Sequence, residues 1–289
     1  MFRKNLLVCM VAWVLLLGTS HANTTSVWKL EKNGNTIYLA GTMHLLKEGD
    51  YPLPNAFHHA FDNSKVLVLE TDVGQLSAPS FQQKLQTEML LPQGQTLDQF
   101  LSDSTLKQAQ QFANSRGIPL QAMSAFKASF VGLTFAVVEL QQLGLTQVGV
   151  DQFFHDKAKQ EAKQLAFLET PAQQIRFLAN LADGDEDAYI RYTLKDIEKL
   201  PEYLDKMHHA WRNGQPQYFE QELIPSMVED FPSIYQSLLV TRNKNWMPTL
   251  LSYFNTEETE AVFVGTLHLP GSDGLLNMLA KHGVKATQL

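Results

Sequence analysis

Two stretches near opposite ends of the chain share one phrase: YLAGTMHLL at residues 38–46 and AVFVGTLHLPG at residues 261–271. In each stretch, a short apolar run typical of a buried strand leads into Gly-Thr-x-His-Leu. His44 and His268 are 224 positions apart, yet each comes just after its expected strand. The repetition predicts two strands that end in the same way, each presenting one imidazole.

Two other apolar runs end in a glutamate. Val66–Glu70 and Leu165–Glu169 both read as short buried strands, and each continues into threonine after Leu-Glu. Ligands of open α/β sheets bind beyond the carboxyl ends of the strands, so neighbouring strands would bring both acids to the histidines. Two imidazoles and two carboxylates suit a divalent transition metal such as Zn, Mn, Fe or Co, with room left for water.

Each of these residues has an ordinary explanation when taken alone. A single histidine at a strand end is more often a core residue than a ligand. A glutamate that closes an apolar strand is usually the first side chain to reach water. The metal-site hypothesis therefore depends on all four residues occurring together, and on the four strand ends being neighbours.

The remaining pattern predicts an α/β fold, a central mixed β-sheet flanked by helices with a large helical insertion. A hairpin is expected from Ser26 to Ala40, because Asn33-Gly34 is a strong turn signal between two strand-like runs. Asp151 is expected to cap a helix that runs to about Gln164. Further helices are expected over residues 54–64, most of 80–143, most of 172–254, and 273–281.

The amino terminus has the pattern of a secretory signal peptide. Arg3 and Lys4 give a basic start, an apolar run follows from Leu6 to Leu17, and small residues precede an expected cleavage after Ala22. The apolar run is too short for a membrane anchor. We therefore expect a signal peptide over residues 1–22, no stable membrane anchor after cleavage, and a periplasmic or secreted protein.

The expected mature chain, residues 23–289, has no linker and is predicted to be one domain. Its only cysteine, Cys9, lies in the signal peptide, so disulfides are not expected. The formal net charge is −7, and losing Arg3 and Lys4 makes the mature chain two units more negative. This acidity argues against nucleic acid as a partner. Motifs of zincins, serine hydrolases and nucleotide-binding loops are missing from the sequence.

Other histidines in the sequence are alternative candidates for metal ligands. His208 and His209 are adjacent, and adjacent residues on a helix cannot face one point, so this pair is expected to face solvent. His155 is likewise expected to be peripheral. The sequence thus assigns metal chemistry to the strand ends alone.

Over essentially the whole mature chain, the sequence resembles the TraB/GumN family. The stretches that carry the resemblance are Trp28-Lys-Leu, YLAGTMHLL, VLVLETD, GVDQFFHDKAKQEAKQLAFLETPAQQIRFL, WRNGQPQYFE, YQSLLVTRNKNWMPTLL and AVFVGTLHLPGSDGLLNMLAKHGV. A departure lies between Met123 and Ser129, where many members have Pro-Trp and this chain has Ser-Ala-Phe-Lys.

The resemblance implies an erythromycin-esterase/ChaN-like fold and kinship with the Tiki proteins, which are metal-dependent proteases. The two G-x-x-H motifs of the family are matched by Gly41–His44 and Gly265–His268, and its acids by Glu70 and Glu169. A divalent metal ion (Mn, Co or Zn) and a peptide or protein substrate are therefore expected. Because related folds include an esterase and a haem-binding protein, a non-catalytic metal-, haem- or peptide-binding protein remains the alternative.

The resemblance also suggests roles for individual residues. His44, Glu70 and His268 would hold the metal, and Glu70 or Glu169 would take a proton from water during attack on an amide or ester carbonyl. Arg242, in the pattern R-N-x-x-W, would stabilise the oxyanion or hold a substrate carboxylate, or it is a helix-surface arginine paired with an acid. Asn243 and Asp151 would contact the substrate, and the alternative for Asp151 is the helix cap.

Overall fold

The computed structural model describes residues 24–76 and 78–289. The predicted signal peptide, residues 1–22, lies outside the described residues. Within them, no helix combines the length and the apolar character needed to cross a membrane.

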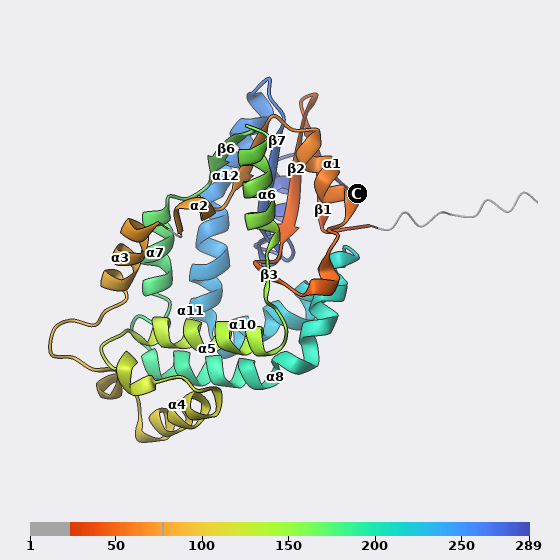
Figure 1. Cartoon of the computed structure of the whole chain (residues 1–289). Coiled ribbons are helices and arrows are strands. Elements are labelled where there is room, and N and C mark those ends of the chain that lie inside the picture. Colours follow the sequence, from red (N-terminus) through yellow and green to blue (C-terminus); the bar gives the residue numbers. More distant parts are fainter. Residues whose placement is uncertain (1–23, 77) are drawn as a thin grey trace, which may run out of the picture.

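The described residues form a six-stranded sheet in the order β6-β4-β7-β2-β1-β8 (Figure 1). The four strands on one side, β6, β4, β7 and β2, run parallel to one another, and β1 is antiparallel to both of its neighbours. This mixed sheet confirms the predicted α/β class. The strands are β1 (Val27–Lys32), β2 (Asn35–Thr42), β4 (Val66–Leu69), β6 (Gln164–Phe167), β7 (Glu260–Gly265) and β8 (Lys285–Gln288).

The predicted hairpin joins β1 to β2. Asn33 has φ 53° and Gly34 has φ 86°, the left-handed backbone that a two-residue Asn-Gly turn requires. The register pairs Lys32 with Asn35 on either side of this turn. The hairpin prediction is therefore confirmed.

Both faces of the sheet are covered by helices, which explains why its strands are apolar almost throughout. On β7, Phe263 packs on one face with Phe57 and Phe154, while Val262 packs on the other with Trp246. The first face is covered by α1 (Asn55–Asp62) and α6 (Val150–Gln160), and the second by α12 (Arg242–Ser252) and α13 (Leu275–Lys281).

A separate helical layer lies beyond the carboxyl ends of the parallel strands (Figure 1). It has its own core, in which Val131 and Phe135 of α5 pack with Ile190 of α8. Its helices and the connecting ones are α2 (Val73–Leu76), α3 (Pro79–Glu88), α4 (Asp103–Arg116), α5 (Ala128–Gln142), α7 (Pro171–Ala179), α8 (Glu186–Arg212), α9 (Pro216–Tyr218), α10 (Ile224–Asp230) and α11 (Pro232–Tyr235). A two-stranded ribbon, β3 (Leu45–Leu46) with β5 (Gln147–Val148), connects the sheet to this layer.

The helix around Asp151 differs from the prediction. It ends at Gln160, because residues from Gln164 onward form strand β6. Its N-cap is Gly149, and Asp151 lies in the first turn without capping it. The carboxylate of Asp151 is turned instead to the carboxyl end of β2, where it contacts His44.

Candidate functional site

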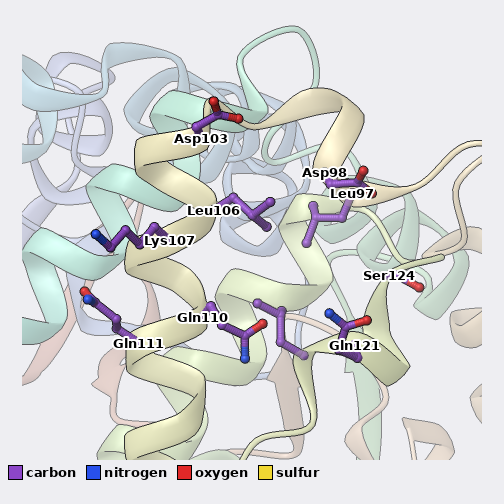
Figure 2. Close-up of a pocket in the computed structure, with 10 residues that line it drawn as sticks. Leu97, Asp98, Asp103, Leu106, Lys107, Gln110, Gln111, Gln121 and Ser124 are labelled. Atoms are coloured by element: carbon purple, nitrogen blue, oxygen red, sulfur yellow. The ribbon is translucent and has the colours of Figure 1, made fainter.

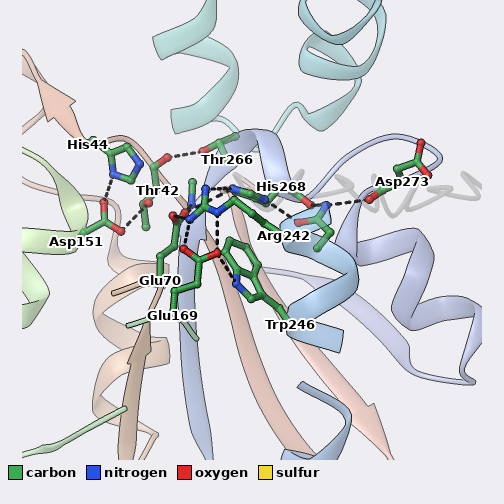
Figure 3. Close-up of polar contacts among 12 residues, drawn as sticks. Thr42, His44, Glu70, Asp151, Glu169, Arg242, Trp246, Thr266, His268 and Asp273 are labelled. Carbon is green, nitrogen blue, oxygen red and sulfur yellow. Dashed lines mark hydrogen bonds and ion pairs between the residues drawn. The ribbon is translucent and has the colours of Figure 1, made fainter. Parts of the chain in front are cut away.

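The carboxyl ends of β2, β4, β6 and β7 meet at one edge of the sheet, and they bring His44, Glu70, Glu169 and His268 together (Figure 3). A Cβ atom built on Gly265 would lie 3.6 Å from His44 Nε2, 3.6 Å from His268 Cδ2 and 3.3 Å from Glu70 Oε1. The two imidazoles are therefore separated by no more than about twice that distance. Gly265 leaves open the space that these side chains share.

The two Gly-Thr-x-His-Leu phrases are adjacent because β2 and β7 pair in parallel. The register places Thr42 opposite Gly265, so the phrases are offset by one residue. Thr266 Oγ1 donates a hydrogen bond of 2.9 Å to the backbone carbonyl of Thr42. A side chain of the second phrase, that of Thr266, is thus hydrogen-bonded to the backbone of the first phrase at Thr42.

His44 is the accessible imidazole of the site, with its side chain 66% exposed. Its Nδ1 lies 2.8 Å from Asp151 Oδ2, and Asp151 Oδ1 accepts a hydrogen bond of 2.9 Å from Thr42 Oγ1. The attraction of Asp151 raises the pKa of His44 above its ordinary value, although water around the ring screens it. With Nδ1 bound to Asp151, His44 turns Nε2 toward the Cβ position of Gly265, 3.6 Å away.

His268 is buried, with only 3% of the residue exposed. Its Nδ1 is 2.7 Å from Asn243 Oδ1, and its Nε2 is 3.2 Å from Arg242 Nη1. A guanidinium can only donate, so Nε2 carries the lone pair and Nδ1 carries the proton. Burial lowers the pKa of His268 to about 3, so the ring is neutral at physiological pH. The ring of Trp246 lies against it at 4.4 Å between centroids.

Arg242 joins the two carboxylates. Nε and Nη2 donate to the two oxygens of Glu169 over 2.8 and 2.9 Å, and Nη2 also donates to Glu70 Oε2 over 2.5 Å. Its side chain is only 8% exposed, so the surface-arginine alternative is wrong. Burial alone would raise the pKa of Glu70, but Arg242, aided by the histidines, lowers it to about 2. Glu70 is therefore ionised.

Asn243 and Asp151, which we expected to contact the substrate, are both committed to histidines. Asn243 Oδ1 accepts from His268, while its Nδ2 donates to the carbonyl oxygens of His268 and Asp273. Both oxygens of Asp151 are occupied by Thr42 and His44. In this arrangement each of the two residues orients an imidazole.

Two residues of the site were missed by the sequence reasoning. Thr42 supports Asp151, and Trp246 Nε1 donates to Glu169 Oε1 over 3.0 Å. A signal for Trp246 was present, because it follows Arg242 by four residues and thus shares its helix face. Thr42 belongs to the repeated Gly-Thr-x-His-Leu phrase, but its role could not be read from that phrase, because its partner Asp151 is 109 positions away.

The prediction that His155 and His208 face solvent is wrong. Both are buried, and each pairs with an aspartate: His155 Nδ1 lies 3.1 Å from Asp156 Oδ1, and His208 Nδ1 lies 2.9 Å from Asp50 Oδ2. His208 falls on the inner face of α8, whereas His209 is exposed, as expected. Adjacent helix residues point in different directions, so solvent exposure of one implies nothing for the other.

A family model described as the TraB/PrgY/gumN family matches residues 26–288. The chain belongs to this family. The match includes both Gly-Thr-x-His-Leu phrases and every residue of the site. Neither a search of curated proteins nor a search of solved structures returned a match.

The site of this TraB/PrgY/gumN chain has donor groups that can be checked against the needs of the expected divalent metal ion. In residues 24–76 and 78–289, no group of three or more His, Cys, Asp or Glu side chains is arranged to hold a metal ion. Arg242 contacts both His268 Nε2 and Glu70 Oε2, two of the expected ligand atoms. The donor types nevertheless fit, because two imidazoles with oriented Nδ1 atoms and an ionised carboxylate are a usual ligand set. An ion on His268 would replace its contact with Arg242.

A hollow of about 620 Å³ lies away from this edge of the sheet, against α4 (Figure 2). Leu97, Leu106 and Leu120 line it together with glutamines, aspartates and one lysine. It contains none of the predicted site residues. The chemistry-bearing side chains are thus gathered at the strand ends.

Proposed function

We propose that the protein is a metal-dependent hydrolase that acts outside the cytoplasm on an amide or ester carbonyl. In this proposal His44, Glu70 and His268 hold a divalent ion (Mn, Co or Zn), and the substrate is a peptide or protein. The observation that carries the proposal is the orientation of the imidazoles. Asp151 and Asn243 hold the Nδ1 atoms, so His44 Nε2 is turned toward the Cβ position of Gly265, and His268 Nε2 keeps a lone pair, which Arg242 Nη1 contacts over 3.2 Å.

A divalent ion supplies two things when bound, a water of lowered pKa and polarisation of the carbonyl. Side chains of the protein would supply proton transfer, orientation and stabilisation of charge. Glu70 Oε1 accepts a hydrogen bond of 2.6 Å from the Gly265 N–H and lies 3.3 Å from the Cβ position of Gly265, on the side of His44 Nε2, so we assign proton transfer to Glu70. Glu169 has both oxygens on Arg242, so we assign it the orientation of that guanidinium. Arg242 would stabilise negative charge on the carbonyl oxygen during attack.

A second candidate is a hydrolase that uses no metal. It is favoured by the contacts of Arg242, which occupy His268 Nε2 and Glu70 Oε2. His44, which is exposed and backed by Asp151 and Thr42, would then be the general base in its deprotonated form, above the pKa that Asp151 raises. The non-catalytic alternative, a protein that binds a metal, haem or peptide, uses the same pocket without turnover.

One experiment separates these candidates. The mature chain is purified, its metal content is measured by mass spectrometry, and peptide cleavage is followed with a chelator and with added Mn, Co or Zn. Cleavage that is lost on chelation and restored by one ion supports the metal-dependent hydrolase. Cleavage that survives chelation but is lost in His44→Ala supports the second candidate. Stoichiometric binding without cleavage supports the binding protein. His209→Ala, an exposed histidine elsewhere, is the control.

The location is tested by sequencing the amino terminus of the exported protein in a Gram-negative host. A mature start at Asn23 in the periplasmic fraction is expected. A membrane-bound form that begins at Met1 would contradict both the signal peptide and the periplasmic or secreted location.

A further inference from the structure

A cavity of about 680 Å³ lies beside the candidate site, between α8 and the segment from Tyr218 to Asp230. Leu267, which directly precedes His268, lines it. Leu45, which directly follows His44, packs on the cluster that contains Leu200, another lining residue. The cavity therefore borders the loop of His268 directly and the loop of His44 through the side chains that pack on Leu45, and its volume is in the range of small-molecule and side-chain pockets.

The wall of the cavity is rich in tyrosine. Tyr192, Tyr203 and Tyr218 line it, together with apolar side chains that include Met207 and Met227. Tyr203 donates its hydroxyl to Asp196 Oδ1 over 2.8 Å. Tyrosine rings combine a large apolar surface with a negative face, so such a wall suits a long aliphatic chain that ends in a cation.

Asp196 supplies a negative charge that the protein itself compensates poorly. The residue is partly buried, and among the described residues its carboxylate pairs with no lysine or arginine, only with Tyr203. Burial raises its pKa, and nearby Asp230 adds to this, while Tyr203 and Lys199 oppose it. Asp230 differs, because Lys195 pairs with it at 2.6 Å. A cationic ligand would give Asp196 the partner that it lacks.

We propose that this cavity binds a lysine or arginine side chain of a peptide, with Asp196 and the tyrosines as its recognition groups. Four carboxylates (Asp196, Glu202, Glu222 and Asp230) and three lysines (Lys195, Lys199 and Lys206) line the cavity, and Lys195 is paired with Asp230. The excess of one carboxylate disfavours occupation by an acidic side chain. A purely apolar side chain would bury Asp196 further without a partner. The substrate class rests on the proposed hydrolase function, since the cavity adjoins that site. Binding itself does not require cleavage.

The test compares three probe peptides, each an acetylated and amidated pentapeptide of alanines with lysine, norleucine or glutamate at its centre. Affinity for the mature protein is measured by calorimetry, and mass spectrometry of the same samples detects cleavage. We expect the lysine peptide to bind about tenfold more tightly than the norleucine peptide, because a charge-assisted contact is gained. Asp196→Asn should remove this preference. Glu198→Gln, which removes the same charge from an exposed position on α8 outside the cavity, should retain it.

Equal affinity for lysine and norleucine in the unaltered protein overturns the proposal, whatever the variants do. So does a preference that survives Asp196→Asn in a protein of unchanged circular dichroism. If that variant does not fold, Glu222→Gln at the exposed rim should weaken the preference, and no change would count against it. Lysine-selective binding without cleavage leaves the cavity assignment standing and removes the hydrolase. Cleavage of the peptides without a preference for lysine supports the hydrolase and overturns the cavity assignment.

Discussion

Thr266 donates its hydroxyl to the backbone carbonyl of Thr42 over 2.9 Å, although the two residues are 224 positions apart. Thr42 in turn donates its own hydroxyl to Asp151, and Asp151 holds His44. A chain of hydrogen bonds thus runs from the second Gly-Thr-x-His-Leu phrase to the histidine of the first. The two threonines occupy equivalent positions in the phrase but have different tasks, one fixing the neighbouring strand and the other orienting a carboxylate.

Gly265→Ala should impair the site without unfolding the protein. The new methyl would stand 3.3 Å from Glu70 Oε1 and 3.6 Å from His44 Nε2, in the space that the proposed ion or substrate needs. The φ of Gly265 is −51°, which alanine adopts without strain. We expect metal affinity or activity to fall about tenfold or more, because small displacements of ligand or substrate groups have effects of this size. The melting temperature should change little.

Gly49→Ala is the matched control, because nothing lies within 4 Å of its Cβ position. Calorimetry with Mn or Co and thermal melts of both variants make the comparison. If Gly265→Ala retains full affinity and activity, the pocket at the strand ends is not the working site.

His44→Ala and His268→Ala should differ in their free energy of unfolding, but both should lose metal affinity. His44 is largely exposed, so water can replace it beside the buried carboxylate of Asp151, and its loss should cost about 1 kcal/mol. Loss of His268 leaves Asn243 Oδ1 without its donor in the interior and should cost about 2 kcal/mol. Each variant should weaken metal binding.

The double variant decides whether the histidines share one ion. Once one ligand is gone the site is disabled, so the double change should cost far less metal affinity than the sum of the single changes. Additive losses, measured by competition with a chelating dye, would mean two independent sites.

Asp151→Asn should move the pH dependence of the site. A protonated imidazole neither binds a metal nor accepts a proton, so metal affinity should rise with pH through the raised pKa of His44. Removing the charge of Asp151 lowers that pKa toward its ordinary value, so the midpoint should shift to lower pH. The maximum affinity should also fall about tenfold, since the ring is less well oriented.

The shift can be read directly from an NMR titration of the His44 ring in the metal-free protein, apart from any activity. Asp205→Asn removes an exposed carboxylate that pairs with Lys47, and it should leave the titration unchanged. An unaltered His44 midpoint in Asp151→Asn would show that the carboxylate does not set the pKa of His44.

His268 should make the protein less stable in acid. Burial holds the pKa of His268 at about 3, below the value of 6.5 for an ordinary imidazole. Between these values the unfolded chain binds a proton that the folded protein does not. Stability should therefore decline as pH falls from 6.5 toward 3, by up to about 1.4 kcal/mol per pH unit.

Urea unfolding at pH 7 and pH 5 measures this decline. Glu70 contributes only at lower pH, because its lowered pKa affects stability between about 4.5 and 2. His268→Gln should reduce the loss between pH 7 and pH 5, whereas His282→Gln, at an exposed position, should not. An equal loss in all three proteins would exclude His268 as its source.

Much of the fold and part of the site could be predicted from local sequence. The run Val66–Glu70 and the turn at Asn33 were correctly placed, because strand propensity and turn chemistry act over a few residues. The four strand-end residues were found for the same reason. A polar side chain directly after a buried parallel strand has to emerge at the common edge.

The sequence by itself thus determined the α/β class and which side chains reach the carboxyl edge of the sheet. Only the tertiary structure decided what those side chains contact. Arg242 is buried against Glu70 across 172 positions of sequence, and Asp151 orients His44 across 107 positions. Local pattern shows which residues can face inward, but it does not show which of them meet. Those partners, and the pKa values that follow from them, depend on how strands and helices far apart in the chain pack together.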